Sequence, residues 1–322
     1  MQGKRYPKIF IRSKSELAKH ISHRGLSRFE AQNLINDVIS HYDNFWKDSK
    51  ESDPKKEKYV RTAKGTPLGL LLQKIDEMVF APHDRMLPNY IFSGVKGKNH
   101  AEAGKHLLGT KKRRTFLKID IKRFFEQISE TRVVSLLKNK CQCSKKAARL
   151  IGFLCCVPLG PKGSTSSIRT IARGFATSSR LAIWCNLDHF IKLEWLIKKM
   201  LKGQDPRIMI YVDDIGISAT HTTMPEMESI YKEVQKIFFS DHNQKLQLHT
   251  LGGKSKIMLH NKNPIILGLE LHRNKLRPTN KTRFKILETK AKLKSEIQPR
   301  EREENRNRLN SLLRYQNYIK NL

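Results

Sequence analysis

The stretch with the most decisive pattern is Arg207-Ile208-Met209-Ile210-Tyr211-Val212-Asp213-Asp214-Ile215-Gly216-Ile217-Ser218, where two adjacent acids interrupt an apolar, β-like run. The apolar residues on both sides predict two strands of a hairpin, with the acids at or near its turn. A buried ionised carboxylate destabilises a protein unless a positive charge compensates it, and a divalent cation is the strongest compensation. Asp is also a common turn residue, so this pair alone indicates no more than a turn.

A second acid follows a similar run. The segment Thr115-Phe116-Leu117-Lys118-Ile119-Asp120 predicts a strand that ends at Asp120. Asp120 alone would fit the N-cap of a helix over residues 121–137. Together with Asp213 and Asp214 it completes the three carboxylates that two-metal phosphoryl transfer requires, because hard cations take oxygen ligands.

The net charge of the chain indicates the class of molecule that it binds. A formal net charge of +33 on 322 residues exceeds what solubility requires and predicts a polyanionic partner. Each basic run alone is consistent with a solvated surface, but the spread of charge favours a long track along nucleic acid. The basic runs are Lys111 to Arg114, Lys198-Lys199, Lys254 with Lys256, and the stretch from Arg273 to Lys320.

Length and composition permit one large domain or two to three lobes with real cores. No apolar stretch has the length of a membrane span, and the basic start of the chain has no signal-peptide core, so we expect a cytoplasmic protein without membrane contact. The five cysteines include no CxxC pair and are expected to be reduced thiols without chemistry.

Periodicity predicts helices over residues 15–46 and 68–80, separated by a charged, exposed linker over residues 47–58. Residues 91–95 are expected to form a short strand. Near the end of the chain, residues 282–297 predict an amphipathic helix whose apolar residues are Phe284, Ile286, Leu287 and Leu293, and residues 300–320 predict a second basic helix.

Five blocks in this order resemble those of bacterial reverse transcriptases. Residues 115–125 resemble the first palm motif, Arg173 to Ala182 the segment usually written QGxPTSPxLAN, and Tyr211 to Asp214 the YxDD motif. Lys254-Ser255-Lys256-Ile257 resembles the following KTxI segment, and residues 266–272 resemble the primer-grip hairpin. A single block would be a weak signal, whereas an ordered set of five is specific.

The resemblance implies an α+β chain with the right-hand polymerase fold, comprising a ferredoxin-like βαββαβ palm, a reduced α-rich fingers region and a short helical thumb. The implied division assigns residues 1–110 to a helical N-terminal and fingers region. Residues 111–262 form the palm, with part of the fingers at 131–170, and residues 263–322 form the primer grip and thumb.

The resemblance also assigns roles to single residues. It implies that Asp120, Asp213, Asp214 and Lys254 are catalytic, and that Asp120, Ile121, Asp213 and Asp214 hold two Mg²⁺ ions, with Mn²⁺ as a substitute. Nucleotide-binding and primer-grip roles fall on a larger set: Phe125, Arg61, Lys64, Arg173, Gly174 and Tyr211 for the nucleotide, and Leu267 and Gly268 for the primer grip. None of the lone histidines His106, His249 and His272 is nominated as catalytic.

The implied activity is RNA-directed DNA polymerisation, with an RNA template or non-coding RNA, dNTPs and a DNA product or RNA–DNA hybrid as partners. An effector protein or a second copy of the chain remains an open partner. The chain departs from the family pattern at Arg173, Ala176 and Ser179, which stand in the places of glutamine and two prolines. These departures leave template handling and nucleotide discrimination open.

Several alternatives also stay open. The outline resembles the unknown-group and abortive-infection enzymes of anti-phage defence, which we favour, and also a divergent retron enzyme that makes msDNA. Residues Glu102 to His106 match the NAxxH segment of retron enzymes only in part. Ile266-Leu267-Gly268 occupies the position of the VTG tripeptide of those enzymes. Protein-primed or template-independent DNA synthesis is a further enzymatic alternative, and a structured-RNA-binding scaffold is the non-enzymatic one.

Overall fold

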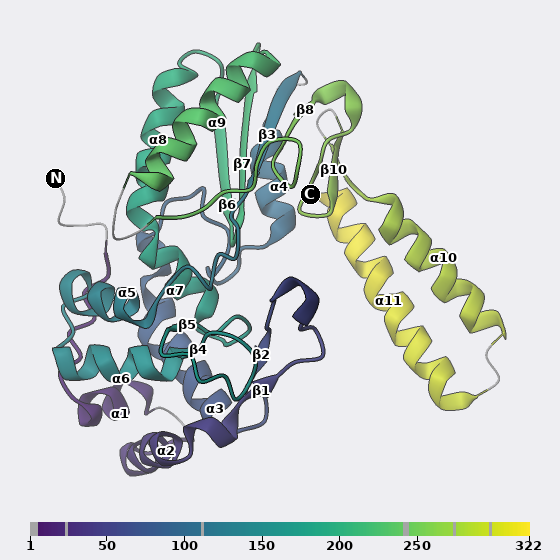
Figure 1. The fold of residues 1–322 in the computed structure, drawn as a ribbon. Coiled ribbons are helices and arrows are strands. Elements are labelled where there is room, and N and C mark those ends of the chain that lie inside the picture. The colour runs from purple at the N-terminus through teal and green to yellow at the C-terminus, as the bar shows by residue number, and fades with distance from the viewer. Residues whose placement is uncertain (1–5, 23–24, 111–112, 241–244, 273–274, 296–297) are drawn as a thin grey trace. The chain divides into compact units, whose positions relative to one another are not determined.

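The computed structural model describes residues 6–22, 25–110, 113–240, 245–272, 275–295 and 298–322 (Figure 1). The described chain is a mixture of helices and small antiparallel sheets, which confirms the predicted α+β class at this coarse level. Its contacts divide into two units. Unit 1 comprises residues 1–97, 121–192 and 237–247, and unit 2 comprises residues 98–120, 193–236 and 248–322. The three-part division expected from the sequence stays a prediction.

Unit 1 is mainly helical. Its elements are α1 (Lys14–Ile21), α2 (Arg28–Ser40), η1 (Tyr42–Phe45), β1 (Lys47–Asp48), η2 (Pro54–Lys56), β2 (Arg61–Thr62), α3 (Pro67–Lys74), the π-helix η3 (Ile75–Phe80), η4 (Ala81–Met86), α5 (Glu130–Ser135), the π-helix η5 (Leu136–Lys140), α6 (Lys145–Cys155), β4 (Cys156–Pro158), β5 (Arg169–Ile171) and α7 (Ser178–Cys185). Helices α8 (Leu187–Met200) and α9 (Met224–Phe239) have residues in both units.

Capping residues mark the starts of the N-terminal helices. Ser13 caps α1, and Ser27 forms a capping box with Glu30 at the start of α2, which satisfies amide groups that would otherwise lack partners. Thr66 caps α3, whose first residue is Pro67. The helices predicted over residues 15–46 and 68–80 are therefore confirmed, with a break between α1 and α2 and a π-helical end to the second.

Two local predictions are wrong. Residues 91–95 form no strand: residues 93–95 are bends, because Gly94 and Gly97 adopt φ angles of +63° and +82° and turn the chain. The helix predicted from residue 121 begins only at Glu130, where Ser129 caps α5. Asp120 is a strand residue rather than an N-cap, and Arg123 has a φ of +43°, which no right-handed helix accommodates.

A four-stranded antiparallel sheet forms the core of unit 2. Its strands are β3 (Arg114–Asp120), β6 (Arg207–Tyr211), β7 (Asp214–Thr220) and β8 (Lys256–Leu259), and they lie side by side in the order β6-β7-β3-β8 (Figure 1). Helix α4 (His100–Leu108) packs on β6 and β7. A Cβ at Gly216 would lie 2.7 Å from a methyl group of Leu107, so glycine permits this close approach.

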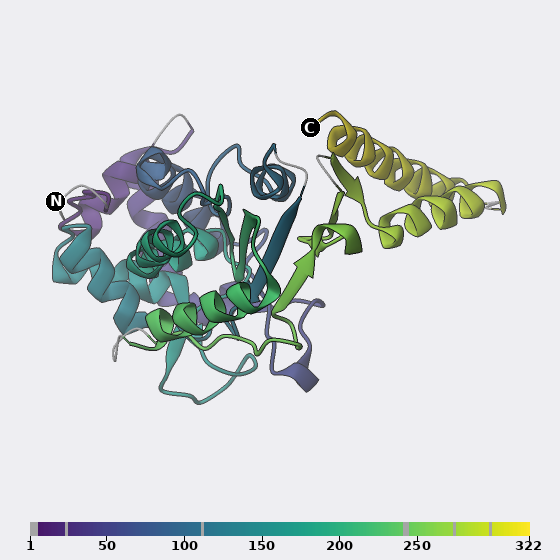
Figure 2. The ribbon, with the colours of Figure 1, turned by 90° about the horizontal axis from the view of Figure 1, so that it is seen from above.

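The rest of unit 2 is a small sheet and two helices. Strands β9 (Ile265–Ile266), β10 (Leu269–His272) and β11 (Lys275–Pro278) pair antiparallel after the short helix η6 (His260–Lys262), which confirms the predicted hairpin at residues 266–272. Helices α10 (Asn280–Ser295) and α11 (Pro299–Asn321) then lie side by side (Figures 1 and 2). Both predicted C-terminal helices are confirmed.

The apolar face expected on α10 is only partly buried. Ile286 is buried, whereas the side chains of Phe284 and Leu287 are 71% and 62% exposed. Residues 284 and 287 lie on a different face from residues 286 and 289, since neighbours on a helix recur every three to four positions. Ile297, Lys111, Lys112 and Arg273, which belong to predicted segments, lie outside the described residues.

All five cysteines are buried free thiols. Burial raises the pKa of Cys155 and Cys185 to about 12, which favours the protonated thiol at neutral pH. Within the described ranges, no helix is both long and apolar enough to cross a membrane.

Candidate metal and nucleotide site

The three predicted metal-binding aspartates come together at one end of the unit 2 sheet. Asp120, the last residue of β3, pairs directly with Asp214, the first residue of β7. Tyr211 pairs with Asp214 across the hairpin, so Val212 and Asp213 form its two-residue turn, as predicted. Val212 has a φ of +56°. This conformation is strained for a β-branched residue, and such strain gathers at functional sites.

Asp214 lies in a largely buried environment that contains charges of both signs. Burial raises the pKa of its carboxyl group, the ammonium group of Lys118 lowers it, and the negative charges of Asp213 and Asp120 raise it again. Lys118 Nζ lies 2.8 Å from Asp214 Oδ1. This buried oxygen accepts no hydrogen bond of good geometry, so the contact with Lys118 is an ion pair.

Asp120 is held by the segment that precedes β8. Its amide group donates to Ser255 Oγ at 3.2 Å, its carbonyl group accepts from the His249 amide at 2.8 Å, and its Oδ1 lies 3.2 Å from His249 Nε2. The predicted catalytic Lys254 has its Nζ 3.9 Å from the same oxygen and a 68% exposed side chain. The structure thus brings Lys254 close to Asp120.

Lys118 and His249 belong to this site, although sequence reasoning assigned neither of them a role. The sequence pattern could have indicated a role for Lys118, because residues two apart on a strand share a face and Asp120 lies two positions further on. No sequence pattern indicated a role for His249. It reaches Asp120 through a loop that returns 129 positions later in the chain, which no local pattern indicates.

The donor chemistry fits Mg²⁺, since three carboxylates supply hard oxygen ligands and one buried oxygen lacks a directed hydrogen bond. In the part of the chain that the structure describes, however, no group of three or more His, Cys, Asp or Glu side chains is arranged as a ready ligand set. Lys118 supplies the positive charge beside Asp214 that a metal would otherwise supply. Ile121, the remaining predicted ligand, directly follows β3 and has a buried side chain.

Most predicted nucleotide-binding residues lie together in unit 1. The guanidinium group of Arg173 forms two hydrogen bonds with the carboxylate of Glu126, at 3.1 and 3.2 Å, and lies over the ring of Phe125, 5.0 Å from its centroid. Phe125 is buried. Arg173 is therefore held by the carboxylate of Glu126 and by the ring of Phe125.

Arg61 is buried and engaged by protein groups. Its guanidinium group forms an ion pair with Asp48, donates to the Gly160 carbonyl group, and lies over the rings of Trp46 and Tyr59. Burial, partly offset by Glu126, lowers its pKa to about 10. In this structure Arg61 fixes β1 and the loop at Gly160, and its expected contact with a triphosphate stays a prediction.

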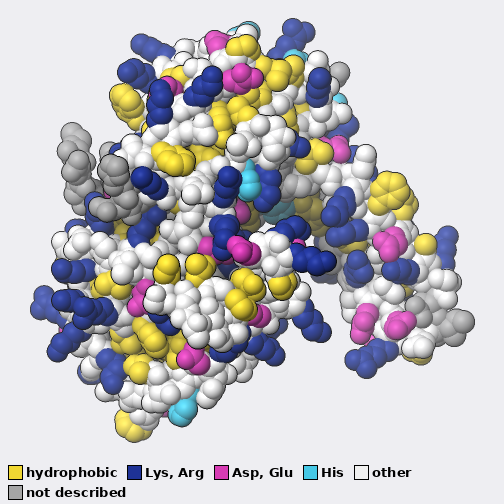
Figure 3. Space-filling model, in the orientation of Figure 1, with side chains coloured by type: hydrophobic (Ala, Val, Ile, Leu, Met, Phe, Trp, Pro, Cys, Tyr) yellow, Lys and Arg dark blue, Asp and Glu magenta, His cyan; other side chains and the backbone are white. Residues whose placement is uncertain are grey.

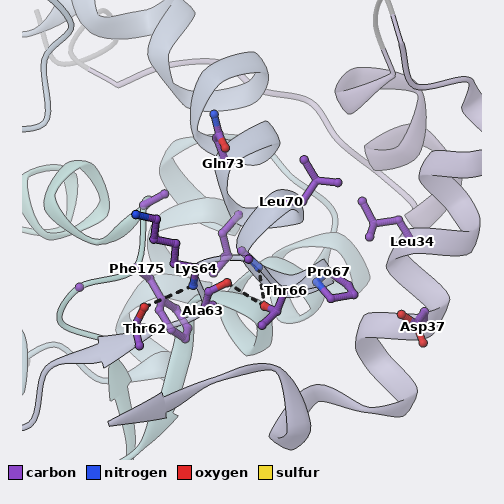
Figure 4. Close-up of a pocket in the computed structure, with 15 residues that line it drawn as sticks. Leu34, Asp37, Thr62, Ala63, Lys64, Thr66, Pro67, Leu70, Gln73 and Phe175 are labelled. Atoms are coloured by element: carbon purple, nitrogen blue, oxygen red, sulfur yellow. Dashed lines mark hydrogen bonds between the residues drawn. The ribbon is translucent and has the colours of Figure 1, made fainter. Parts of the chain in front are cut away.

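Lys64 and Gly174 line one pocket of about 720 Å³ between α2, α3 and the loop at residues 174–176 (Figure 4). Its wall is largely apolar, with Leu34, Pro67, Leu70 and Phe175 (Figure 4). Gly174 has a φ of +102°, and a Cβ there would lie 2.4 Å from the carbonyl oxygen of Arg61. Only glycine therefore allows this loop to approach β2.

Tyr211 and the primer-grip residues lie in unit 2. Burial raises the pKa of Tyr211, whose ring meets the edge of the His100 ring at 6.4 Å. His100 in turn stacks on Tyr315 of α11 at 5.5 Å. Leu267 and Gly268 form the turn between β9 and β10, with φ angles of +52° and +73°, as a two-residue hairpin turn requires.

No protein-family model matches the chain, and no curated protein matches it significantly.

Proposed function

We propose that this chain is an RNA-directed DNA polymerase of the reverse transcriptase type. One observation carries the proposal: β3 and the β6–β7 hairpin set Asp120 opposite Asp214, with Asp213 in the adjoining turn. Two Mg²⁺ ions bound there would activate the attacking hydroxyl group and stabilise the leaving pyrophosphate. The negative charges of Asp213 and Asp120 raise the pKa of Asp214, and bound cations would relieve this repulsion between the carboxylates.

The order of elements supports the finer fold assignment within this proposal. Along the chain, β3, helices, β6, β7, α9 and β8 follow the βαββαβ order of a ferredoxin-like palm, and the sheet order β6-β7-β3-β8 is that of the same motif. The β9–β11 sheet and the basic pair α10 and α11 would then be the primer grip and thumb.

The residues of the chain have separate tasks in this proposal. Asp120, Asp213 and Asp214 hold the ions, and the exposed ammonium group of Lys254 neutralises or protonates the pyrophosphate. Phe125, Arg173 and Gly174 of unit 1 are the residues proposed to contact the nucleotide, and Glu126 fixes the direction of the Arg173 guanidinium group. Positioning and electrostatics suffice, because phosphoryl transfer needs little covalent help from protein.

The test is primer extension on an RNA template with the purified full chain. We expect Mg²⁺-dependent DNA synthesis that Asp213→Asn/Asp214→Asn abolishes, at least about a thousandfold, because neither amide replaces an anionic ligand. Glu228→Gln, at an exposed acid of α9, is the matched control and should retain activity. Full extension by the folded double variant would overturn the proposal.

A non-catalytic RNA-binding scaffold is the second candidate function. The ion pair between Lys118 and Asp214 favours it, because an acid neutralised by lysine needs no metal. A scaffold would bind RNA equally well with and without Mg²⁺ and would show no synthesis with any primer. Association with a structured non-coding RNA, and a role in anti-phage defence or as a retron enzyme, rest on the sequence resemblance alone and remain part of the proposal.

A further inference from the structure

A basic groove lies in unit 1, and none of the candidate metal or nucleotide residues lines it. Helices α5 and α6, the π-helix η5 and the loop at residues 167–169 enclose a groove of about 690 Å³. Dark-blue Lys and Arg side chains gather on the face of the molecule where α5 and α6 lie (Figures 1 and 3). None of the five sequence blocks covers this segment.

The charges in the groove that have no ion-pair partner among the described residues are positive. Lys138, Lys145 and Arg149 line it and are exposed, and within the described ranges none of the three forms an ion pair. Glu130 is the only acid among the described lining residues, and its Oε2 already accepts a 2.6 Å hydrogen bond from Arg169 Nε. Three uncompensated cations therefore face the groove.

The other lining groups suit a nucleic-acid backbone. The hydroxyl groups of Ser135 and Thr131 and the side-chain amide of Asn139 stand beside the cations, and Asn139 Nδ2 donates to Ser135 Oγ at 3.1 Å. Such groups contact phosphate and ribose oxygens. Ile168, with a 56% exposed side chain, offers an apolar surface for a base or sugar.

The groove is preformed by close helix packing. A Cβ at Gly152 of α6 would lie 2.8 Å from a methyl group of Val134 on α5, so glycine lets the two helices approach. Val134 also lines the groove and forms part of its floor. Lys145 and Arg149 are four positions apart on α6 and therefore share one face.

We propose that this groove binds the phosphate backbone of a structured RNA, as an anchoring site additional to the proposed polymerase site. An acidic protein segment would also satisfy the cations, but the hydroxyl and amide groups and the overall charge of +33 favour RNA. The inference does not require polymerase activity, because the groove lies outside the proposed metal and nucleotide residues.

The test compares two triple variants of the full chain by fluorescence anisotropy with a labelled RNA hairpin of about 20 base pairs, long enough to span two successive minor grooves. Lys138→Glu/Lys145→Glu/Arg149→Glu alters the groove. Lys19→Glu/Lys202→Glu/Lys232→Glu changes the net charge equally at exposed lysines elsewhere. We expect the groove variant to bind at least about tenfold more weakly than the control variant, with a salt slope lower by about two to three. Equal affinities would overturn the proposal.

A crosslinking experiment covers the case in which the groove variant fails to fold. Ile168→p-benzoylphenylalanine places a photo-reactive group on the exposed rim while retaining all three cations. We expect irradiation to attach the labelled hairpin, and unlabelled hairpin to compete far better than polyglutamate. No crosslink, or better competition by polyglutamate, would overturn RNA as the occupant.

Discussion

Asp214 is subject to two opposing requirements, because the proposed metal site needs its negative charge and the fold largely buries that charge. Lys118 lowers the pKa of the carboxyl group, whereas burial, Asp213 and Asp120 raise it, with a net upward shift. The native state therefore holds the Asp214 proton more tightly than the unfolded chain. The stability from this group is fully present below the ordinary Asp pKa and is lost as the pH rises through the raised folded pKa.

From this sign we predict that Asp214→Asn melts higher than the wild type at neutral pH, by roughly 2–4 °C, because the amide cannot ionise. The difference should shrink as the pH falls towards the raised folded pKa, where the wild-type carboxyl group begins to take up its proton. Thermal unfolding followed by circular dichroism measures this. Lys118→Met is the opposing control and should melt lower than the wild type at neutral pH. Identical melting temperatures at every pH would contradict the prediction.

Residue patterns predicted part of the site and missed another part for a physical reason. Apolar, strand-like runs indicated that Asp120 ends a strand and that Asp213 and Asp214 lie at or near a hairpin turn, and the structure pairs Asp120 with Asp214. His249 and Ser255 reach Asp120 only through tertiary folding, which leaves no trace in local sequence. The ion pair between Arg61 and Asp48 likewise could not be predicted from the local sequence.

At the scale of elements, the contact between β2 and the loop after β5 depends on a single glycine. Gly174 combines a positive φ with a close approach to the carbonyl oxygen of Arg61, and the Arg61 amide donates to the Arg173 carbonyl group at 2.6 Å. This contact fixes the loop that carries Arg173. A methyl group at position 174 therefore displaces one side of the proposed nucleotide site.

We predict that Gly174→Ala lowers the free energy of unfolding by about 2–4 kcal/mol, from left-handed backbone strain and steric overlap together. Urea denaturation measures the change. Gly163→Ala is the matched control, since Gly163 has a φ of +84° but no atom lies within 4 Å of the place that an added methyl group would occupy, so only the backbone strain applies. Equal losses of stability in the two variants would show that the approach to Arg61 contributes nothing.

Periodicity alone predicted the helical stretches over residues 15–46 and 68–80. It did not show the break before α2, where Ser27 and Glu30 form a capping box, or the start of α3 at Thr66 and Pro67. The helix expected from residue 121 failed because periodicity does not reveal a positive φ at Arg123, and Phe124 and Phe125 are buried outside any helix. Tertiary burial of aromatic side chains outweighed local propensity there.

At the scale of the whole molecule, the excess of positive charge is distributed rather than confined to one region. Residues 280–322 carry twelve basic and five acidic side chains, which gives +7 of the total of +33. The two C-terminal helices therefore hold a minor share of the charge that can attract nucleic acid. The rest lies on the remaining chain, including the groove between α5 and α6.

This distribution predicts how binding to an RNA–DNA hybrid depends on salt. Lys281, Lys285 and Lys290 are exposed on α10, and Lys281→Gln/Lys285→Gln/Lys290→Gln should lower the slope of log affinity against log salt by about one for each phosphate that the variant no longer neutralises. A steep residual slope should persist, because most of the positive charge lies elsewhere.

Anisotropy titrations from about 50 to 300 mM salt measure both slopes. Lys19→Gln/Lys202→Gln/Lys232→Gln controls for net charge. If the α10 variant abolished the salt dependence, the charge of the two C-terminal helices alone would account for binding, whereas a slope equal to that of the control would remove α10 from the interface.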